Sequence, residues 1–140
     1  MKKVVLDTNI LISGTFWDGS SFKILDMIDK KKIESVLSKE IIAEFDKIIN
    51  CAEIIEKIQD KNLTMSKVSQ RIIINSKIVE PKVKLEIVKE DPNDNIILEC
   101  AKAGNVDFII SNDNHLLKLK KFEKIMIVTP KEFVTLITQP

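Results

Sequence analysis

The sequence predicts an α/β fold: a three-layer α/β/α sandwich with a mainly parallel central sheet. Two observations predict it. Apolar runs of strand length alternate with amphipathic runs of helical length, and the strand-sized runs are largely apolar throughout. Strands that are apolar on both faces are typical of parallel sheets covered by helices on each side. No repeat, linker or low-complexity run divides the 140 residues, so we expect a single domain over residues 1–140.

Each expected element follows from the spacing of its apolar residues. The expected strands are residues 3–6, 33–38, 77–81, 106–110 and 124–130. The expected helices are residues 9–13, 20–31, 39–58, 62–76, 92–103 and 131–138. The first helix is expected to end near Gly14, Ser20 or Ser21 is expected to cap the second, and Gly104 is the expected C′ residue of the fifth.

The composition is that of a soluble globular protein, with 44% hydrophobic and 31% charged residues. No run reaches the roughly 20 uncharged apolar residues that span a bilayer. Lys2 and Lys3 precede an apolar run, as in a signal peptide, but Asp7 and Asn9 interrupt it and no small-residue cleavage site follows. We therefore expect a cytoplasmic protein with no membrane partner.

Cysteines and overall charge point to no special class. Cys51 and Cys100 lie far apart and form no CxxC pattern, so we expect two buried, reduced thiols. The formal net charge of +1 gives no global basic field. Lysines gather locally at residues 30–32 and again at Lys118, Lys120, Lys121 and Lys124. Such runs are usually solvated faces and alone are weak support for a phosphate-bearing partner.

Two expected strands lead into acidic residues. In the run VVLDTNILIS, Asp7 follows the first strand, and Asp113 lies three residues beyond Ile110, where another strand ends. Parallel strands bring their carboxyl ends to one edge of the sheet, and ligands of α/β sheets bind outside that edge. We expect both acids there, although ordinary turn polarity is an alternative explanation for Asp113.

Two further acids lie on helices and face inward. Glu44 borders the apolar stripe of its helix, whereas Glu40 and Asp46 fit a solvated pattern. Asp94 lies in the run EDPNDNIILECAKAG and shares a helical face with the apolar residues that follow it. A capping role is the alternative for Asp94, because Asp91 can be the N-cap and Asp94 the third helical residue.

Four acids that converge would repel one another. At an effective dielectric constant of about 20, each pair some 5 Å apart costs about 3 kcal/mol. Either their pKa values rise so that some protons stay bound, or a divalent cation lies among them. Oxygen ligands suit Mg²⁺ or Mn²⁺ better than Zn²⁺. Such a site commonly supports phosphoryl chemistry.

The sequence resembles the PIN-domain family over essentially the whole chain. The motifs that carry the resemblance occur in the family's order: VVLDTNILIS, an inward Glu44, DPNDNIILECA, FIISNDNHLL and IVTPKEF. The closest resemblance is to bacterial PIN proteins described as toxin components of toxin–antitoxin systems. It implies a ribonuclease that cuts single-stranded RNA and uses Mg²⁺ or Mn²⁺. It also implies an antitoxin protein as partner, and a homodimer by analogy.

The resemblance also implies roles for individual residues. Asp7, Glu44, Asp94 and Asp113 would hold the metal and activate the attacking water. Thr8 and Asn9 would orient the first acid, and Ser111 would occupy the small hydroxyl position before the last one.

One position departs from the family pattern. Many members carry a further acid two residues after the one that matches Asp113, and here that residue is His115. His115 would bind a scissile phosphate or cap a helix, and the structural role is favoured because the chain has a single histidine. Lys118, Lys120, Lys121 and Lys124 would hold RNA phosphates near the acidic edge.

Other acidic α/β enzymes fit less well. A haloacid-dehalogenase-like phosphatase would have a second acid where Asn9 stands, and a receiver domain would have an acidic pair after the first strand. DPNDN lacks the glycine and closing glutamate of an EF-hand loop. P-loop and dinucleotide fingerprints are absent from the sequence. The remaining alternative is a non-catalytic PIN-fold module that binds RNA or a protein.

Overall fold

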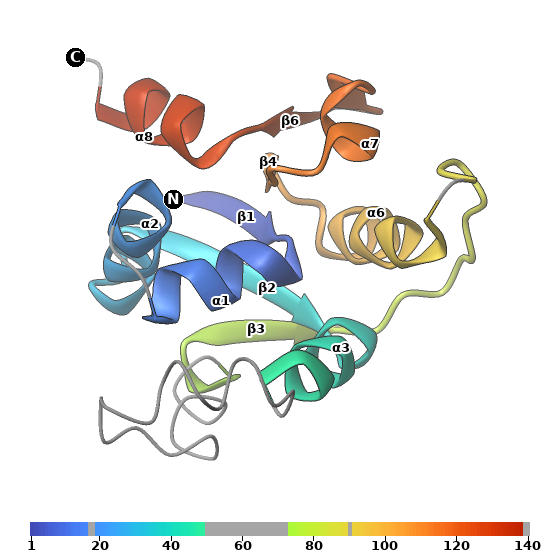
Figure 1. The fold of residues 1–140 in the computed structure, drawn as a ribbon, viewed down its shortest axis with the longest axis horizontal. Helices are drawn as coiled ribbons and strands as arrows, with labels where there is room; N and C mark the ends of the chain where they lie inside the picture. The colour runs from blue at the N-terminus through green and yellow to red at the C-terminus, as the bar shows by residue number, and fades with distance from the viewer. Residues whose placement is uncertain (17–18, 50–72, 90, 139–140) are drawn as a thin grey trace.

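The computed structural model describes residues 1–16, 19–49, 73–89 and 91–138, with side chains at 13–16 and 49 left out. One six-stranded sheet has the order β3-β2-β1-β4-β6-β5 (Figure 1). The strands are β1 Lys2–Leu6, β2 Ile33–Ser38, β3 Ser76–Val79, β4 Phe108–Ile110, β5 Lys121–Phe122 and β6 Ile125–Val128. The described helices are α1 Thr8–Phe16, α2 Ser20–Asp29, α3 Lys39–Ile49, α6 Pro92–Gly104, α7 Asn114–Leu117 and α8 Pro130–Thr138.

All neighbouring strands pair in parallel except β5, which pairs antiparallel with β6. The helix α2 packs on α1 and on α8, whereas α6 packs on β1, β2 and β4. The chain moves from β1 to β2 in one direction along the sheet and from β3 back to β4 in the other. Because crossovers between parallel strands are right-handed, the helices of these two connections cover opposite faces of the sheet (Figure 1). The predicted three-layer α/β fold is therefore confirmed.

The core explains why the central strands are apolar on both faces. Val4, Val5 and Leu6 of β1 are all fully buried, as are Ile109 and Ile110 of β4. Successive side chains of a strand point to opposite faces, so burial of consecutive residues requires helices on both sides of the sheet.

Several helix ends differ from the sequence-based expectations. The first helix continues through Gly14 to Phe16, and Gly19, at φ 120°, takes the N-cap position of α2 in place of either serine. Asn105, in the left-handed conformation, ends α6, while Gly104 is its last residue. A Cβ on Gly104 would lie 2.6 Å from Val36 Cγ1, so tight packing on β2 requires glycine there.

Two predicted features lie outside the described residues: most of the helix expected over 62–76, and the second half of the helix expected over 39–58, which includes Cys51. The short helix α7 and the strand β5 had no expected counterpart. Cys100 is a buried free thiol, as expected.

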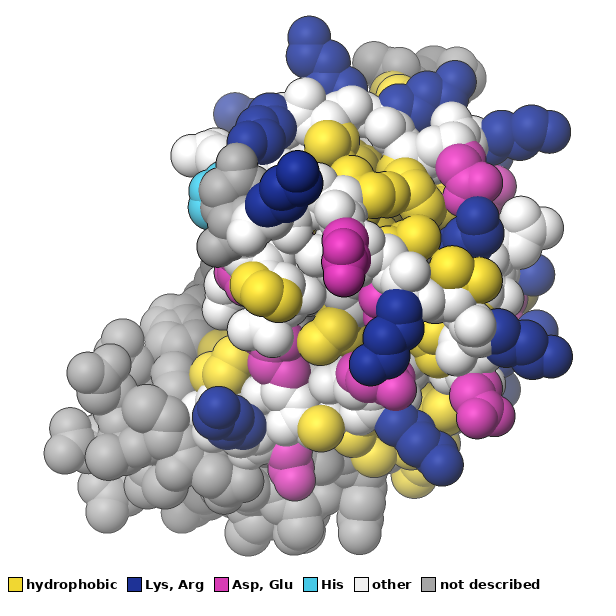
Figure 2. All heavy atoms as spheres, turned by 90° about the vertical axis from the view of Figure 1, so that its right-hand side faces the viewer, with side chains coloured by type: hydrophobic (Ala, Val, Ile, Leu, Met, Phe, Trp, Pro, Cys, Tyr) yellow, Lys and Arg dark blue, Asp and Glu magenta, His cyan; other side chains and the backbone are white. Residues whose placement is uncertain are grey.

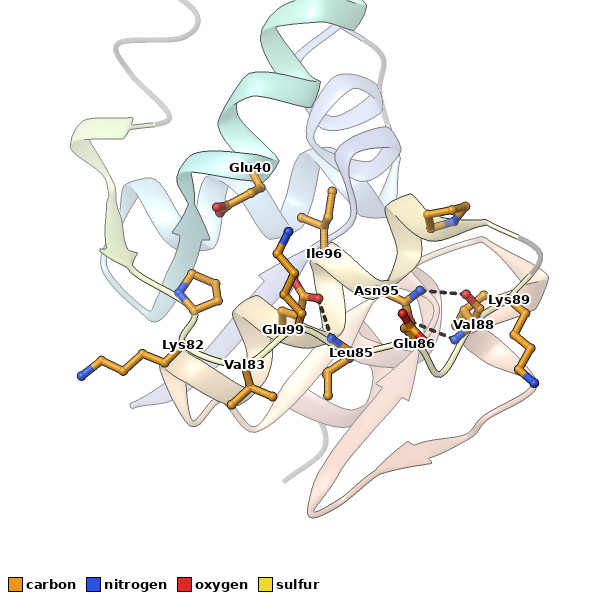
Figure 3. A pocket seen from close by; sticks show the side chains of 13 residues that line it. Glu40, Lys82, Val83, Leu85, Glu86, Val88, Lys89, Asn95, Ile96 and Glu99 are labelled. Atoms are coloured by element: carbon orange, nitrogen blue, oxygen red, sulfur yellow. Dashed lines mark hydrogen bonds between the residues drawn. The ribbon is translucent and has the colours of Figure 1, made fainter.

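Residues 81–89, which precede α6 in the sequence, form an extended segment that lies across this helix (Figure 3). We call this segment the strap. Two side chains of α6 hold it. The Asn95 carboxamide accepts hydrogen bonds from the amides of Ile87 (3.0 Å) and Val88 (2.9 Å) and donates one to the Val88 carbonyl (2.7 Å). Glu99 accepts one from the amide of Leu85 (2.8 Å). A groove of about 740 Å³ lies along the strap and α6.

In the part of the chain that the structure describes, no helix is both long and apolar enough to cross a membrane.

Candidate metal centre at the carboxyl edge of the sheet

Asp7 and Ser111 meet where the central strands end. The Asp7 amide donates to the Ile110 carbonyl (3.0 Å), which continues the β1–β4 pairing by one residue and places Asp7 beside Ser111. Ser111 Oγ donates to Asp7 Oδ2 (2.7 Å) and accepts from the Asp113 amide (2.9 Å). A single buried hydroxyl therefore fixes the Asp7 carboxylate and the backbone that carries Asp113.

Asp113 is the N-cap of the short helix α7. Its Oδ1 accepts a hydrogen bond from the His115 amide (2.7 Å). This cap turns the His115 imidazole back toward the acids, with Nδ1 3.5 Å from Asp113 Oδ1 and 3.8 Å from Asp94 Oδ2.

Asp94 comes to the same place from the start of α6. Asp91 caps the helix by accepting from the Asn93 amide (3.0 Å), and Pro92 is the first helical residue, as the sequence predicts. Asp94 is only 4% exposed, on the buried face with Ile97 and Leu98. The helical phase predicted this inward orientation.

Glu44 lies on α3. Ser38, the last residue of β2, accepts a hydrogen bond from the Ile41 amide (3.3 Å), which starts the helix directly at the end of the strand. Glu44 is half-buried, whereas Glu40 and Asp46 are exposed, as expected from the apolar stripe.

Three carboxyl groups have raised pKa values. Burial is the main cause for each, and repulsion from neighbouring acids adds to it. The pKa of Asp94 rises to about 7, through burial and then the charges of Asp113, Asp91, Asp7 and Glu44. The pKa of Glu44 is raised by burial and by Asp7 and Asp91. Burial also raises the pKa of Asp7, although hydrogen bonds from Ser111 and the backbone at Asn9 and Thr8 oppose the shift.

Buried polar atoms without partners mark the site as a place for a ligand. Among the described residues, three buried side-chain atoms lack a hydrogen-bond partner: Thr8 Oγ1, Asp94 Oδ2 and His115 Nδ1. Buried polar atoms are normally hydrogen-bonded, and each exception needs an explanation such as an absent ion. One ligand atom each from Asp94, Asp113 and His115 lies within 4.8 Å of the others, and among the described residues no other group of three His, Cys, Asp or Glu side chains could hold a metal ion in this way. A divalent cation fits these oxygen and nitrogen donors.

The other predicted residues are less tightly gathered. Asp7 and Glu44 are outside that three-residue group, although their charges act on Asp94. The backbone amides at Thr8 and Asn9 bind the Asp7 carboxylate, while the Asn9 side chain is exposed. The sequence-based expectations did not include Ser38 as the cap that places Glu44, although a serine directly before a helix is the usual N-cap signal.

The predicted RNA-binding lysines are all solvent-exposed. Lys118 is the C-cap of α7, Lys120 lies between α7 and β5, and Lys121 begins β5. On the face in Figure 2, lysine side chains are interspersed with acidic and hydrophobic ones. That face therefore carries no continuous basic field, in agreement with the net charge of +1.

The fold and this edge together define a class: α/β proteins in which acids from separate elements gather at the carboxyl edge of a parallel sheet. The chain belongs to the PIN domain family, whose model matches residues 3–115. The resemblance in the sequence is thereby confirmed.

Solved structures support the fold. One similar chain comes from the crystal structure of VapBC2 from Rickettsia felis bound to a DNA fragment from their promoter. The match has a TM-score of 0.55 at 18% identity and covers 89% of this chain and 96% of that one. No curated protein matches the sequence.

Proposed function

We propose that this protein is a metal-dependent ribonuclease that hydrolyses phosphodiester bonds in single-stranded RNA. The observation that carries the proposal is Asp94: the residue is only 4% exposed, one carboxylate oxygen is buried without a partner, and other acids surround it. Burying such a group is costly unless an opposite charge accompanies it. Membership of the PIN domain family supports the same activity.

Asp7, Glu44, Asp94 and Asp113 would hold Mg²⁺ or Mn²⁺. When bound, the ion polarises a phosphate oxygen and lowers the pKa of a bound water, which supplies the nucleophile. Ser111 keeps the Asp7 carboxylate and the Asp113 backbone in place through its two hydrogen bonds. Such supporting contacts typically contribute roughly 10–100-fold to metal affinity or activity.

The exposed Lys118, Lys120 and Lys121 follow Asp113 closely in the chain and would hold RNA phosphates. A single strand suits such a site because its backbone can bend toward the acidic edge without unwinding a duplex.

We further propose that the nuclease is the toxin of a toxin–antitoxin pair, acts in the cytoplasm and forms a homodimer. The resemblance to PIN proteins described as toxin components supports this role. So does the similarity to a chain of VapBC2, a complex solved on promoter DNA.

Calorimetric titration of Mn²⁺ and Mg²⁺ into chelator-treated protein, with cleavage of a mixed-sequence single-stranded RNA in parallel, tests the activity. We expect saturable binding and metal-dependent cleavage in the wild type. Both should be lost in Asp7→Asn, while RNA binding persists because the lysines are untouched. Glu40→Gln removes an exposed acid and is the matched control. The absence of metal binding at millimolar concentration would favour the non-catalytic binding module instead.

A further inference from the structure

We propose that His115 binds the metal ion directly through Nδ1, and that this nitrogen ligand makes the site prefer Mn²⁺ to Mg²⁺. The inference rests on the proposed function, since it concerns the same ion. It gives a role to the residue at which the sequence departs from the acidic pattern of the family.

The burial of the imidazole is uneven. The His115 side chain is 42% exposed, yet its Nδ1 atom is buried and has no hydrogen-bond partner. A surface histidine would turn its nitrogens to water. The ring of His115 instead presents an unpaired nitrogen to Asp94 and Asp113.

The distances suit a shared ion better than a hydrogen bond. His115 Nδ1 lies 3.8 Å from Asp94 Oδ2 and 3.5 Å from Asp113 Oδ1, whereas a hydrogen bond needs about 3.2 Å or less. An ion with bonds of about 2.1 Å can contact two ligand atoms at once when they lie up to about 4.2 Å apart. Both observed separations fall within that range.

Asp94 is the independent second observation. Its side chain is 5% exposed, and its Oδ2 is unpartnered although it faces a nitrogen that could donate a proton. A structural aspartate–histidine pair would close to hydrogen-bonding distance and satisfy both atoms. A cation between Asp94 Oδ2 and His115 Nδ1 explains why these two atoms face each other without forming a hydrogen bond.

Helix capping does not account for the imidazole. The N-cap of α7 is Asp113, whose carboxylate accepts the backbone amide of His115. The cap uses only the backbone of residue 115 and positions its side chain toward the acids. The imidazole is therefore available as a ligand.

The ligand type sets the metal preference. Mg²⁺ strongly prefers oxygen donors and near-ideal octahedral geometry. Imidazole suits Fe, Ni, Cu and Zn best, and Mn²⁺, as a first-row transition ion, accepts it more readily than Mg²⁺ does. A site that keeps several carboxylates and gains one nitrogen accepts Mn²⁺ with less loss than Mg²⁺.

Pulsed electron paramagnetic resonance of the Mn²⁺-loaded protein, prepared without a histidine tag, tests the ligand. The chain contains one histidine, so an imidazole ¹⁴N coupling on bound Mn²⁺ can come only from His115. We expect that coupling in the wild type and its loss in His115→Asp. The wild-type spectrum needs no variant, so the test does not depend on whether the variant folds.

Calorimetry tests the preference. We expect His115→Asp to lower the ratio of Mn²⁺ to Mg²⁺ affinity by about tenfold or more, because it replaces nitrogen with oxygen. Asn114→Asp adds the same charge at a neighbouring exposed position and should leave the ratio within about twofold of the wild type. An equal change in both variants would show that charge alone sets the ratio and would overturn the preference.

The remaining outcomes separate the two proposals. Mn²⁺ that binds and supports RNA cleavage without a ¹⁴N coupling would overturn His115 as a ligand and leave the nuclease intact. A protein that binds Mg²⁺ but no Mn²⁺ would overturn the inference about His115 alone, and a protein that binds neither ion would overturn both proposals.

Discussion

Asp94 and Asn95 are neighbours near the start of α6, and burial leaves them 4% and 7% exposed. Asn95 uses its carboxamide in three hydrogen bonds with Ile87 and Val88 of the strap, at 2.7 to 3.0 Å. The Asp94 carboxylate points toward the acidic edge, and its Oδ2 has no partner. One helix turn therefore carries a satisfied buried polar group beside an unsatisfied one.

The contrast teaches how to separate structural from functional polarity in this molecule. A buried polar group that stabilises the fold finds its partners within the fold, because an unmade hydrogen bond costs roughly 1–3 kcal/mol. Asn95 of α6 follows that rule in its bonds to the strap, and so does Glu99, which accepts a hydrogen bond from the Leu85 amide (Figure 3). The exceptions in the described chain gather at the carboxyl edge of the sheet, where Thr8, Asp94 and His115 each leave an atom unpaired.

Asp94→Asn should sharpen the contrast most. Without metal, the variant should be more stable than the wild type by about 1 kcal/mol, because a buried charge among Asp113, Asp91 and Asp7 is removed. With Mn²⁺, binding should weaken by roughly 100-fold or more, since a carboxylate ligand is lost. Urea denaturation and calorimetry measure the two effects. A less stable metal-free variant would contradict the assignment of Asp94 as a group kept for a ligand.

Asn95→Ala should show the opposite pattern. We expect a loss of about 2–3 kcal/mol in the free energy of unfolding, because the buried amide of Val88 and its neighbour lose their acceptor. Metal affinity should change by less than about threefold, since no ligand is touched. Asn93→Ala, at an exposed position on the same turn, is the control and should stay within about 0.5 kcal/mol of the wild type. Loss of metal binding comparable to that in Asp94→Asn would break the distinction.

Much of the fold and part of the site could be predicted from the sequence. The alternation of apolar strands and amphipathic helices predicted the three layers, since a strand as apolar as VVL has to be covered on both faces. Asp7 was predicted to lie at the carboxyl edge because it follows that strand. The helical phase of Asp94 with Ile97 and Leu98 predicted its burial.

The remaining features depend on contacts between distant segments, which no local pattern contains. Asn105 rather than Gly104 takes the left-handed conformation that ends α6, and Gly104 is needed because Val36 of β2 lies against it. The approach of His115 to Asp94 requires both the cap at Asp113 and the position of α6. Among the described residues the strap pairs with no strand, and its partners on α6 lie 7 to 14 residues away.

The pH dependence of stability provides the last and smallest test of the contrast. In the metal-free protein the pKa of Asp94 is about 7, above its ordinary value of 3.8, and burial also raises the pKa values of Asp7 and Glu44. Between pH 3.8 and about pH 7, Asp94 keeps a proton in the folded chain that it has lost in the unfolded chain, so unfolding releases protons. The stabilisation is fully present below about pH 4 and is lost as the pH rises through about 7.

We therefore expect the free energy of unfolding in a chelator to fall from about pH 5 to about pH 8. Denaturation curves at several pH values measure this slope. Asp94→Asn should flatten it, whereas Asn95→Ala should keep it at a lower overall stability. With saturating Mn²⁺ the slope should reverse, since protons compete with the ion for the same oxygens. A slope that is unaffected by both Asp94→Asn and Mn²⁺ would mean that Asp94 is as well satisfied within the fold as Asn95.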